Sequence, residues 1–386
     1  MWQVIRIGNV KNDSLNLKIQ PVFVDEKTGK ETQKYQLHKD DILFTMTGTK
    51  GKRDYFYSVK VQTIEKKLLL NQRVGCLRLF TPYINVDFLC LSLKCQYILD
   101  AIFSTETGNV SQGNIGSEST LNLKIAIPPF AEQCRIVTEV NKWYMAIEQL
   151  EQEKDKLQSS IDQVKSKVLD LAIHGKLVPQ DPNDEPAIEL LKRINPKAEI
   201  ITDNGHYQKL PEGWTICKLK DICSKLVDGD HNPPKGTKET TEYLMLSAQN
   251  IVNDNIVYTN GVRYLNHDAF ETSDKRTKVM QGDLLITIVG TLGRSCVFSD
   301  NKKITLQRSV ACLTPLIYNH FLKYYMDSSS IQKYMTTNAK GTAQKGFYLN
   351  QLEQLPIMIP PLTEQQRIVA RIEKIFARLD VIESAL

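Results

Sequence analysis

The sequence contains no run of roughly 18 apolar residues, so it offers no candidate for a membrane-spanning helix. Its first residues, MWQVIRIGNVKND, lack the apolar core of a secretory signal. The eight cysteines form no C-x-x-C pair and the six histidines form no H-x-x-x-H pair, which argues against a structural zinc site. Dispersed cysteines without a secretory signal fit a reducing compartment, so we expect a cytoplasmic protein without a membrane partner.

Motifs for nucleotide or cofactor chemistry are also missing. The segments GTKGK (48–52) and GTLGR (290–294) do not match a phosphate-binding loop, and each follows an apolar run that predicts a strand. The segment HNPPK (231–235) resembles the N-P-P-aromatic motif of adenine methyltransferases, but Lys235 stands where an aromatic ring should stack on a flipped base. The sequence therefore predicts no catalytic residue, no metal site and no cofactor in this chain.

One phrase occurs twice, as IPPFAEQCRIV (127–137) and as IPPLTEQQRIV (359–369), at an offset of 232 positions. After each phrase, apolar residues continue in alternating steps of four and three, which is typical of a coiled-coil seam. The first seam contains Ile136, Val140, Trp143, Ile147 and Leu150, and the second contains Ile368, Ile372, Ile375, Leu379 and Ile382. In the first copy the seam predicts a helix from Ala131 to His174, about 66 Å long, that stops at Gly175.

A helix of that length with a narrow apolar stripe needs a partner, and the second copy carries the same stripe. We therefore expect the two helices to form an antiparallel coiled-coil pair. The alternative is two unrelated amphipathic helices that bury their faces on separate domains.

The repetition extends upstream of the helices, where WQVIRIGNVKNDSLN (2–16) aligns with YLMLSAQNIVNDNIV (243–257) and DDILFTMTGTKGK (40–52) aligns with GDLLITIVGTLGR (282–294). The expected fold is therefore α+β (mixed α/β), with two β-rich globular domains separated by the helix pair. The predicted segments are a first domain at 1–130 that is incomplete at its start, a helix at 131–175, a linker at 176–209, a second domain at 210–361 and a shorter helix at 362–386.

Three of these segments resemble one known family. The repeated phrase, the segment LDLAIHGKLVPQDPNDEPAIELLKRI (169–194) and the segment LPEGWTICKLKDI (210–222) are similar to the specificity (S) subunit of type I restriction–modification enzymes. The resemblance covers nearly the whole chain, in the order recognition domain, conserved helix, recognition domain, conserved helix. Within it, we interpret QDPNDEP (180–186) as a solvated linker.

The resemblance implies a non-catalytic subunit that binds double-stranded DNA. Each recognition domain would read one half of a split target, and the helices would set the gap between the halves. Two methylation (M) subunits, which bind S-adenosylmethionine, and motor-nuclease (R) subunits would be the partners. The incomplete first domain and the short second helix also raise the possibility of a self-dimer.

Candidate DNA contacts are polar or basic residues in the turns, because such side chains reach phosphates and base edges from a rigid sheet. In the first domain they are Thr49, Lys50, Lys52, Arg53, Arg73, Asn109, Ser111, Gln112 and Asn114. In the second domain they are Asp230, His231, Lys235, Thr291, Arg294, Arg308, Lys340, Thr342, Gln344 and Lys345. Gln112 and Gln344, like Arg73 and Arg308, recur in both halves, so they could equally be internal hydrogen-bond anchors.

Two further classes of function stay open at this stage. One is a stand-alone methyltransferase or nuclease with its own target domains, which binding of S-adenosylmethionine to the isolated chain would reveal. The other is a coiled-coil scaffold that carries lectin-like or peptide-binding domains, which salt-dependent DNA binding would exclude.

Overall fold

The computed structural model describes residues 1–62, 66–109, 111–202, 210–252, 254–259, 261–341 and 344–386. The chain forms two compact units, Met1–Gln152 and Glu153–Leu386. The division between the units falls inside the long helix α5 (Phe130–Ile173), which therefore contributes residues to both units. The sequence instead predicts this helix as a segment of its own.

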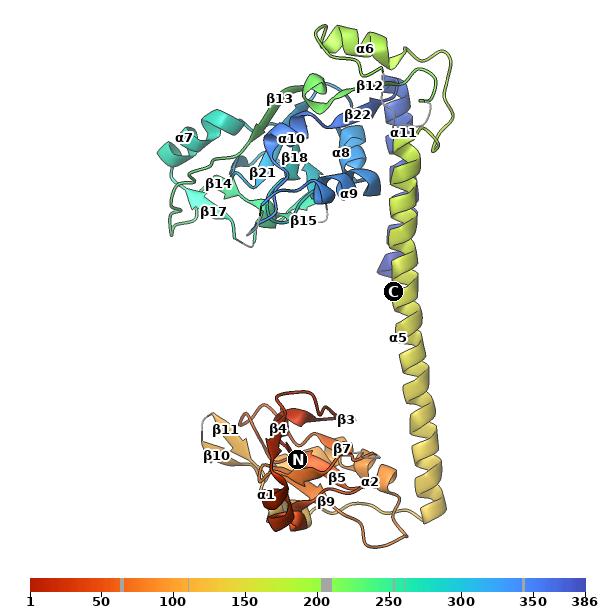
Figure 1. Cartoon of the computed structure of the whole chain (residues 1–386), viewed down its shortest axis with the longest axis vertical. Coiled ribbons are helices and arrows are strands. Elements are labelled where there is room, and N and C mark those ends of the chain that lie inside the picture. Colours follow the sequence, from red (N-terminus) through yellow and green to blue (C-terminus); the bar gives the residue numbers. More distant parts are fainter. Residues whose placement is uncertain (63–65, 110, 203–209, 253, 260, 342–343) are drawn as a thin grey trace. The chain divides into compact units, whose positions relative to one another are not determined.

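The first unit is built from short strands and short helices (Figure 1). Its strands are β1 (Trp2–Ile5), β2 (Val10–Lys11), β3 (Ser14–Leu15), β4 (Val22–Val24), β5 (Ile42–Thr45), β6 (Thr47–Gly48), β7 (Ser58–Lys60), β8 (Leu68–Leu70), β9 (Val74–Leu77), β10 (Thr107–Asn109) and β11 (Gln112–Asn114). Its helices before α5 are α1 (Glu26–Glu31), α2 (Val86–Ser92), α3 (Gln96–Phe103) and α4 (Ser117–Leu121), with 3₁₀ turns at Ile7–Asn9 and Gln33–Tyr35. The sheet orders are β4-β1-β8, β7-β5-β9, β10-β11-β6 and β2-β3.

The second unit follows the same plan with longer elements. Its strands are β12 (Thr215–Lys218), β13 (Cys223–Asp228), β14 (Tyr243–Leu246), β15 (Ile251–Val252), β16 (Asn255–Ile256), β17 (Arg263–Leu265), β18 (Leu284–Thr287), β19 (Ser295–Val297), β20 (Lys303–Leu306), β21 (Val310–Pro315) and β22 (Pro356–Ile359). Its helices are α6 (Ala187–Ile194), α7 (His267–Thr277), α8 (Asn319–Asp327), α9 (Ser329–Thr337), α10 (Leu349–Glu353) and α11 (Leu362–Ser384), with 3₁₀ turns at Leu219–Ile222 and Ala248–Asn250. The sheet orders are β17-β14-β20, β13-β21-β18-β19, β12-β22 and β15-β16.

The strand pairings repeat from one unit to the other. The strand β1 pairs antiparallel with β4 and parallel with β8, and β14 pairs in the same way with β17 and β20. The strand β5 lies between β7 and β9, and its counterpart β18 lies between β19 and β21. All residues of β5 and of β18 are buried, so the two apolar runs form the central strands of their units, as the sequence predicts. The internal repeat is therefore a repeat of structure.

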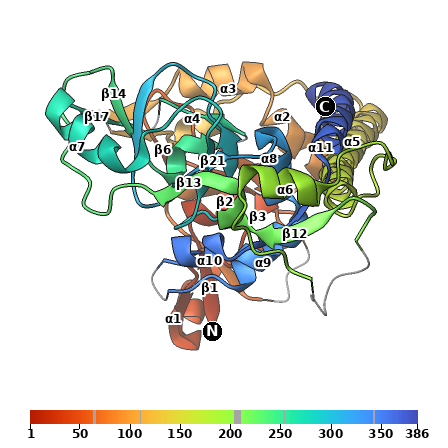
Figure 2. The same cartoon turned by 90° about the horizontal axis from the view of Figure 1, so that it is seen from above.

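The helices α5 and α11 lie side by side and run antiparallel where they pair (Figure 2). Lys154 donates to the backbone oxygen of Leu386 at 2.5 Å, and Lys165 lies 2.8 Å from a carboxylate oxygen of both Asp380 and Glu383. As the residue number rises along α5, the number of its partner on α11 falls. At its end, α5 passes into Gly175, which has the left-handed φ of 65° that favours glycine after a helix.

The apolar seam is buried in only part of the pair. Ile368 and Ile372 of α11 are buried in the core of the second unit, together with Val168, Leu169 and Ile173 of α5. In contrast, Ile136, Trp143, Ile147 and Leu150 of α5 are exposed, with Trp143 at 64%, and so is Ile382 of α11. The prediction that this first stretch of the seam is buried against the second helix is therefore wrong. The reason is register, because α11 pairs with the part of α5 that follows Gln152.

The segment QDPNDEP (180–186) after α5 is exposed except at Asp184, as its interpretation as a solvated linker predicts. Asp184 pairs with Arg367 of α11 at 2.6 Å, and its side chain is almost fully covered. The segment then forms α6, which buries Ala187, Leu190 and Leu191 on the second unit. The linker itself is thus solvated apart from Asp184, and the helix α6 that follows it contributes Ala187 and Leu191 to the core of the second unit.

A buried aspartate recurs before the central strand of each unit and makes a testable prediction. Asp41 accepts from Arg78 through both carboxylate oxygens at 2.7 Å and from the backbone of His38, and Asp283 is held by Lys225 in the same position. Burial alone would raise the pKa of Asp41, but Arg78 and the His38 amide outweigh it and lower the pKa.

We expect Asp41→Asn to reduce the free energy of unfolding by about 1–3 kcal/mol near pH 7. The folded-state pKa lies below the ordinary value, so this stability is present above pH 3.8 and is lost as pH falls through the folded pKa. Urea denaturation should therefore show a difference between the two proteins that shrinks below about pH 4. An equal difference at all pH values would show that the charge of Asp41 contributes nothing.

Candidate nucleic-acid interface

Three turns of the first unit converge at one end of its central sheet. The strand β6, which continues the chain after β5, pairs with β11 through Thr47 and Asn114. Lys50 donates from its Nζ to the backbone oxygen of Gly108 at 2.8 Å, and the amide of Met46 donates to the oxygen of Arg73 at 3.1 Å. The first loop cluster is thus formed by residues 46–54, 71–73, 106–109 and 111–115.

Ion pairs hold part of this cluster in place. Arg53 lies 2.6 Å from Asp100 and stacks over the ring of Phe103, and its guanidinium lowers the pKa of Asp100. Asp54 accepts from the amide of Thr49 at 2.7 Å, and the side chain of Thr49, followed by this amide, lowers the pKa of Asp54. The sequence-predicted residues of the cluster lie on exposed or half-buried surface: Thr49, Lys50, Lys52, Arg53, Arg73, Asn109, Ser111, Gln112 and Asn114.

The corresponding turns of the second unit also converge. Val289 bridges to Gly346, and the amide of Gly290 donates to the oxygen of Lys345 at 3.1 Å. The amide of Ile288 donates to the oxygen of Ser309 at 2.9 Å. These contacts join the segments 288–294, 306–309, 340–341 and 344–346 into the second loop cluster. Its exposed sequence-predicted residues are Thr291, Arg294, Arg308, Lys340, Gln344 and Lys345, whereas Thr342 lies outside the described residues.

The turn around Asp230 adds to the second cluster, and the described residues of the first unit contain no equivalent of it. Asp230 bridges in parallel fashion to Gln307, and its carboxylate accepts from Ser273 at 2.6 Å and from the amide of Asn232 at 2.8 Å. The carboxylate of Asp230 therefore holds the turn, and this internal use does not suit a contact with a phosphate. His231 and Lys235 are exposed.

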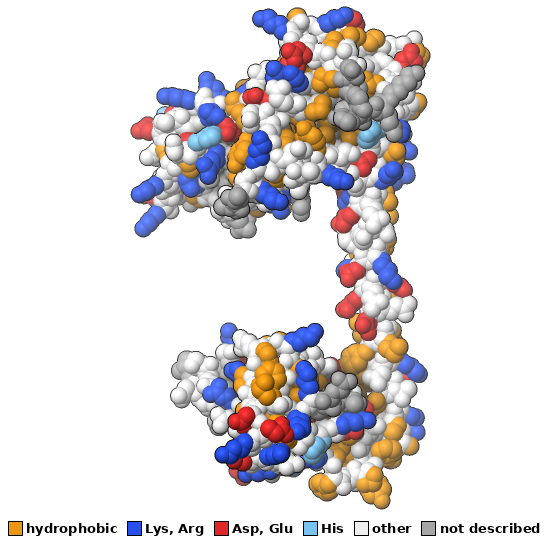
Figure 3. All heavy atoms as spheres, viewed as in Figure 1, with side chains coloured by type: hydrophobic (Ala, Val, Ile, Leu, Met, Phe, Trp, Pro, Cys, Tyr) orange, Lys and Arg blue, Asp and Glu red, His pale blue; other side chains and the backbone are white. Residues whose placement is uncertain are grey.

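Two arginines that fix this turn were missed by the sequence reasoning. Arg263 donates to the backbone oxygen of Pro234 at 2.6 Å, and Arg276 of α7 pairs with Asp228, which also contacts His231 at 2.7 Å. These partners are 29 to 48 positions apart, so no local pattern signals them. Figure 3 shows Lys and Arg side chains over the end of this unit that carries α7, β14 and β17.

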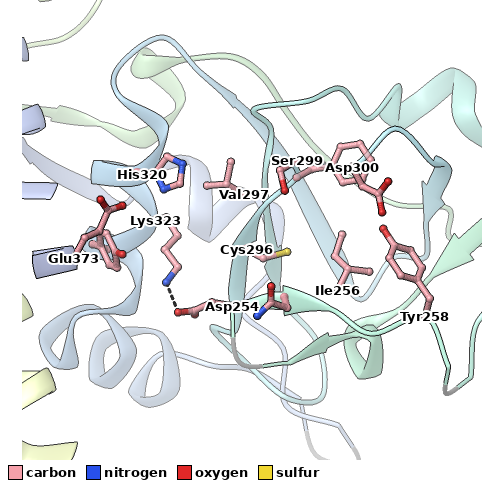
Figure 4. Close-up of a pocket in the computed structure, with 13 residues that line it drawn as sticks. Asp254, Ile256, Tyr258, Cys296, Val297, Ser299, Asp300, His320, Lys323 and Glu373 are labelled. Atoms are coloured by element: carbon pink, nitrogen blue, oxygen red, sulfur yellow. Dashed lines mark ion pairs between the residues drawn. The ribbon is translucent and has the colours of Figure 1, made fainter. Parts of the chain in front are cut away.

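A cavity of about 380 Å³ lies elsewhere on the second unit, between α8, β19 and the hairpin β15-β16 (Figure 4). Lys323 is buried beside it, 2.6 Å from Asp254 and 2.9 Å from Asp327. Burial would lower the pKa of Lys323, but Asp327 and Asp254 outweigh burial and raise it. The ion pair between Lys323 and Asp254 thus connects the hairpin β15-β16 to α8. The first unit has an equivalent ion pair, in which Lys94, just after α2, contacts Asp13 of the hairpin β2-β3.

The described part of the chain brings together no group of three or more His, Cys, Asp or Glu side chains that could hold a metal ion. Over the same residues, no helix has both the length and the apolar character needed to cross a membrane. The structure contains two exposed loop clusters, and backbone hydrogen bonds and ion pairs hold each of them in place.

A family model matches this chain twice, once in each of the two repeated halves. The family model described as the type I restriction modification DNA specificity domain matches residues 2–159 and 211–386. The specificity subunit of the EcoBI type I restriction enzyme of Escherichia coli is 25% identical over 362 residues, which cover 92% of this chain and 71% of that subunit. The EcoEI subunit of Escherichia coli is 24% identical over 378 residues, covering 78% of this chain and 62% of that subunit. The chain thus spans 62% to 71% of the length of these two relatives.

Solved structures show the same fold. The HsdS subunit from Thermoanaerobacter tengcongensis matches 99% of this chain and 84% of its own, with a TM-score of 0.56 and 15% identity. A chain from work on complex assembly and conformational transition of the type I R-M system matches 99% of this chain and 85% of its own, with a TM-score of 0.63 and 15% identity. The predicted mixed fold, with two domains and long helices, is confirmed.

Proposed function

Because this chain belongs to the family of type I restriction–modification DNA specificity subunits, we propose that each of its two loop clusters reads one half of a split double-stranded DNA target. One observation carries the proposal. The two clusters stand on the same repeated frame, yet their side chains differ: the turn after β5 carries Lys50, Lys52 and Arg53, whereas the turn after β18 carries Thr291 and Arg294. Two domains that share their strand pairings but differ in the polar side chains of their turns are suited to bind two half-sites of different sequence.

The chain itself is a DNA-recognition subunit and not an enzyme. S-adenosylmethionine and the methyl-transfer chemistry would come from two partner methylation subunits, which flip the target adenine into their own pockets. Motor-nuclease subunits would join for cleavage. The exposed surface of α5 around Trp143 and the charged stretch Glu151–Ser160 offer the area on which methylation subunits dock.

The helix α5 would act as the spacer between the half-sites. It runs for 44 residues without glycine or proline, so its length is set by its sequence. The family's recognition of DNA, together with this length, supports a fixed gap between the two short specific parts of the target.

Co-expression of the chain with a type I methylation subunit, followed by mapping of methyladenine in host DNA, tests the proposal. We expect a split motif with two specific parts and a constant gap. A palindromic motif would instead indicate dimers in which only one domain of each copy reads DNA. Random methylation, or none from a stable complex, would contradict the assignment of both loop clusters.

A further inference from the structure

One threonine fixes the end of the turn after the central strand in the same way in both units. In the second unit it is Thr287, the last residue of β18, whose amide donates to the backbone oxygen of Arg294 at 2.9 Å. In return, the amide of Arg294 donates to Oγ1 of Thr287 at 2.9 Å, and the amide of Gly293 donates to the Thr287 carbonyl at 2.8 Å. Three hydrogen bonds thus hold the backbone of Arg294 immediately before β19.

The first unit repeats this arrangement around Thr45, the last residue of β5. The amide of Thr45 donates to the oxygen of Tyr57 at 3.1 Å, the amide of Tyr57 donates to Oγ1 of Thr45 at 3.1 Å, and the amide of Phe56 donates to the Thr45 carbonyl at 3.0 Å. Phe56 and Gly293 both have a left-handed backbone, with φ of 61° and 79°. Tyr57 is therefore the structural equivalent of Arg294.

The alignment of the repeated sequences does not show this equivalence. It places Lys52 opposite Arg294, because both turns carry the pattern G-T-x-G before a basic residue. The first turn is longer, with residues 46–56 between the paired positions against residues 288–293 in the second. The hydrogen bonds of the threonine do not depend on the length of the turn, and they place Tyr57 opposite Arg294 instead.

The helices α8 and α9 hold the second turn from another side. Nε2 of Gln332 donates to the oxygen of Gly293 at 2.9 Å and to a backbone oxygen of α8 at 2.7 Å, so both of its hydrogens are used. A Cβ at Gly293 would lie 2.2 Å from Oε1 of Gln332, so the glycine is needed for this close approach. Ser295 donates to Asp327 at 2.6 Å. The residues on both sides of Arg294 are therefore anchored.

The side chain of Arg294, in contrast to its backbone, is exposed. Within the part of the chain that the structure describes, its guanidinium has no ion pair and no hydrogen bond, whereas Arg53 of the first unit is held by Asp100 at 2.6 Å. A fixed backbone limits the positions that the guanidinium can reach, which suits a base edge with one defined geometry. The two parallel N–H groups of arginine match O6 and N7 of guanine in the major groove.

Tyr57 brings a different side chain to the same position. It is half-buried, and Nζ of Lys11 in β2 lies 4.9 Å from the centroid of its ring. Its hydroxyl is a single donor, so Tyr57 cannot form the two parallel hydrogen bonds of an arginine. The sequence reasoning missed this residue, because it stands in the aromatic stretch YFY (55–57) and not among the polar residues of the turn.

We propose that the position directly before the edge strand of the central sheet, Arg294 in the second unit and Tyr57 in the first, determines specificity in each recognition domain. The inference rests on the proposed function, since it names one reading residue in each of the two half-site readers. Arg294 forms a bidentate contact with a guanine of its half-site, and Thr287 is the residue that positions it. Tyr57 selects its base through the hydroxyl, so the two domains differ at this position.

Methyladenine mapping, with the chain co-expressed with a type I methylation subunit, tests the inference. The wild-type chain should give a split motif with a guanine in the half-site that Arg294 reads. We expect Arg294→Ala to lower the discrimination for this guanine about tenfold, and to leave the other specified positions and the gap unchanged. Arg294→Lys keeps the charge but lacks the planar fork, so it should lose the same discrimination. Lys192→Ala, at an exposed position of α6, should keep the full motif.

Three further variants test the positioning threonine and the tyrosine. Thr287→Val removes the Oγ1 acceptor at nearly constant volume and should lower the discrimination for guanine about threefold, because the Arg294 amide loses a partner. Thr287→Ser keeps the hydroxyl and should preserve the discrimination, and thermal unfolding shows whether the two variants fold equally. Tyr57→Phe should relax one position of the other half-site about threefold. Discrimination unchanged by Thr287→Val or by Tyr57→Phe would contradict the role given to that residue.

The outcomes separate this inference from the proposed function. A split motif that is unchanged by Arg294→Ala, or that has no guanine at the affected position, overturns the inference and leaves the proposed function standing. A uniform loss of methylation at all positions, with a smaller salt dependence of DNA binding, also overturns the inference, because Arg294 would then contact a phosphate. A wild-type chain that directs no split motif overturns both together.

Discussion

A chain in which residues 148–154 (EQLEQEK) are duplicated within α5 is expected to direct methylation to a target with the same two half-sites and a longer gap. Seven additional helical residues add about 10.5 Å and nearly two whole turns, so the apolar stripe continues in phase. At 3.4 Å per base pair, the gap should grow by up to about three base pairs. Methylation of the original target should fall to background.

The position of the duplication is chosen from the contacts of α5. Lys154 and Gln158 contact α11, and a duplication of residues 148–154 keeps the copy that leads into Gln158 in the same register with α11. As a matched control, the same seven residues attached after Leu386 should leave the gap unchanged. An unchanged gap with the duplication, or altered half-site sequences, would rule out the spacer role of the helix.

Removal of three exposed cations of the second loop cluster is expected to abolish recognition of one half-site. We predict that the triple variant Arg294→Ala, Arg308→Ala and Lys345→Ala lowers methylation of the split target at least 100-fold, because base contacts are each worth about 1–3 kcal/mol. If all three side chains contact phosphates instead, the slope of log affinity against log salt should fall by about three.

The two outcomes of this experiment distinguish contacts to base edges, which determine sequence specificity, from contacts to phosphates, which contribute affinity alone. Methylation mapping and a salt titration of DNA binding with the methylation complex supply the measurements. The triple variant Lys192→Ala, Lys197→Ala and Lys220→Ala removes the same charge from the exposed surface around α6 and should keep full methylation. Equal losses in both triple variants would mean that net charge, and not the loop cluster, governs binding.

Local patterns were sufficient to predict the repeat, the central strands and the long helix. The helix was expected at Ala131–His174 and is found at Phe130–Ile173, because its heptad steps and its glycine stop are encoded within the segment itself. The turns after β5 and β18 were predicted for the same reason, since buried apolar runs end there in Gly and Thr.

Burial could not be predicted from the repeated phrase, because it depends on segments far away in the chain. Ile136 and Ile368 stand in the same local sequence, yet Ile136 is exposed and Ile368 is fully buried. The difference comes from the end of α5, α6 and β12, which pack on α11. The same limit applies to the loop clusters, where Arg263 and Arg276 hold the turn around Asp230 through partners distant in sequence.

The absence of glycine and proline between Phe130 and Ile173 has a mechanical consequence. Sharp kinks in helices arise at such residues or at inserted turns, so α5 has no site at which it can fold back or hinge. At its end, Val168, Leu169 and Ile173 are buried in the core of the second unit, so flexing is left to its start, at the pair Pro128-Pro129. The helix therefore behaves as a stiff extension of the second unit, and any rearrangement during assembly is expected to turn about the two prolines.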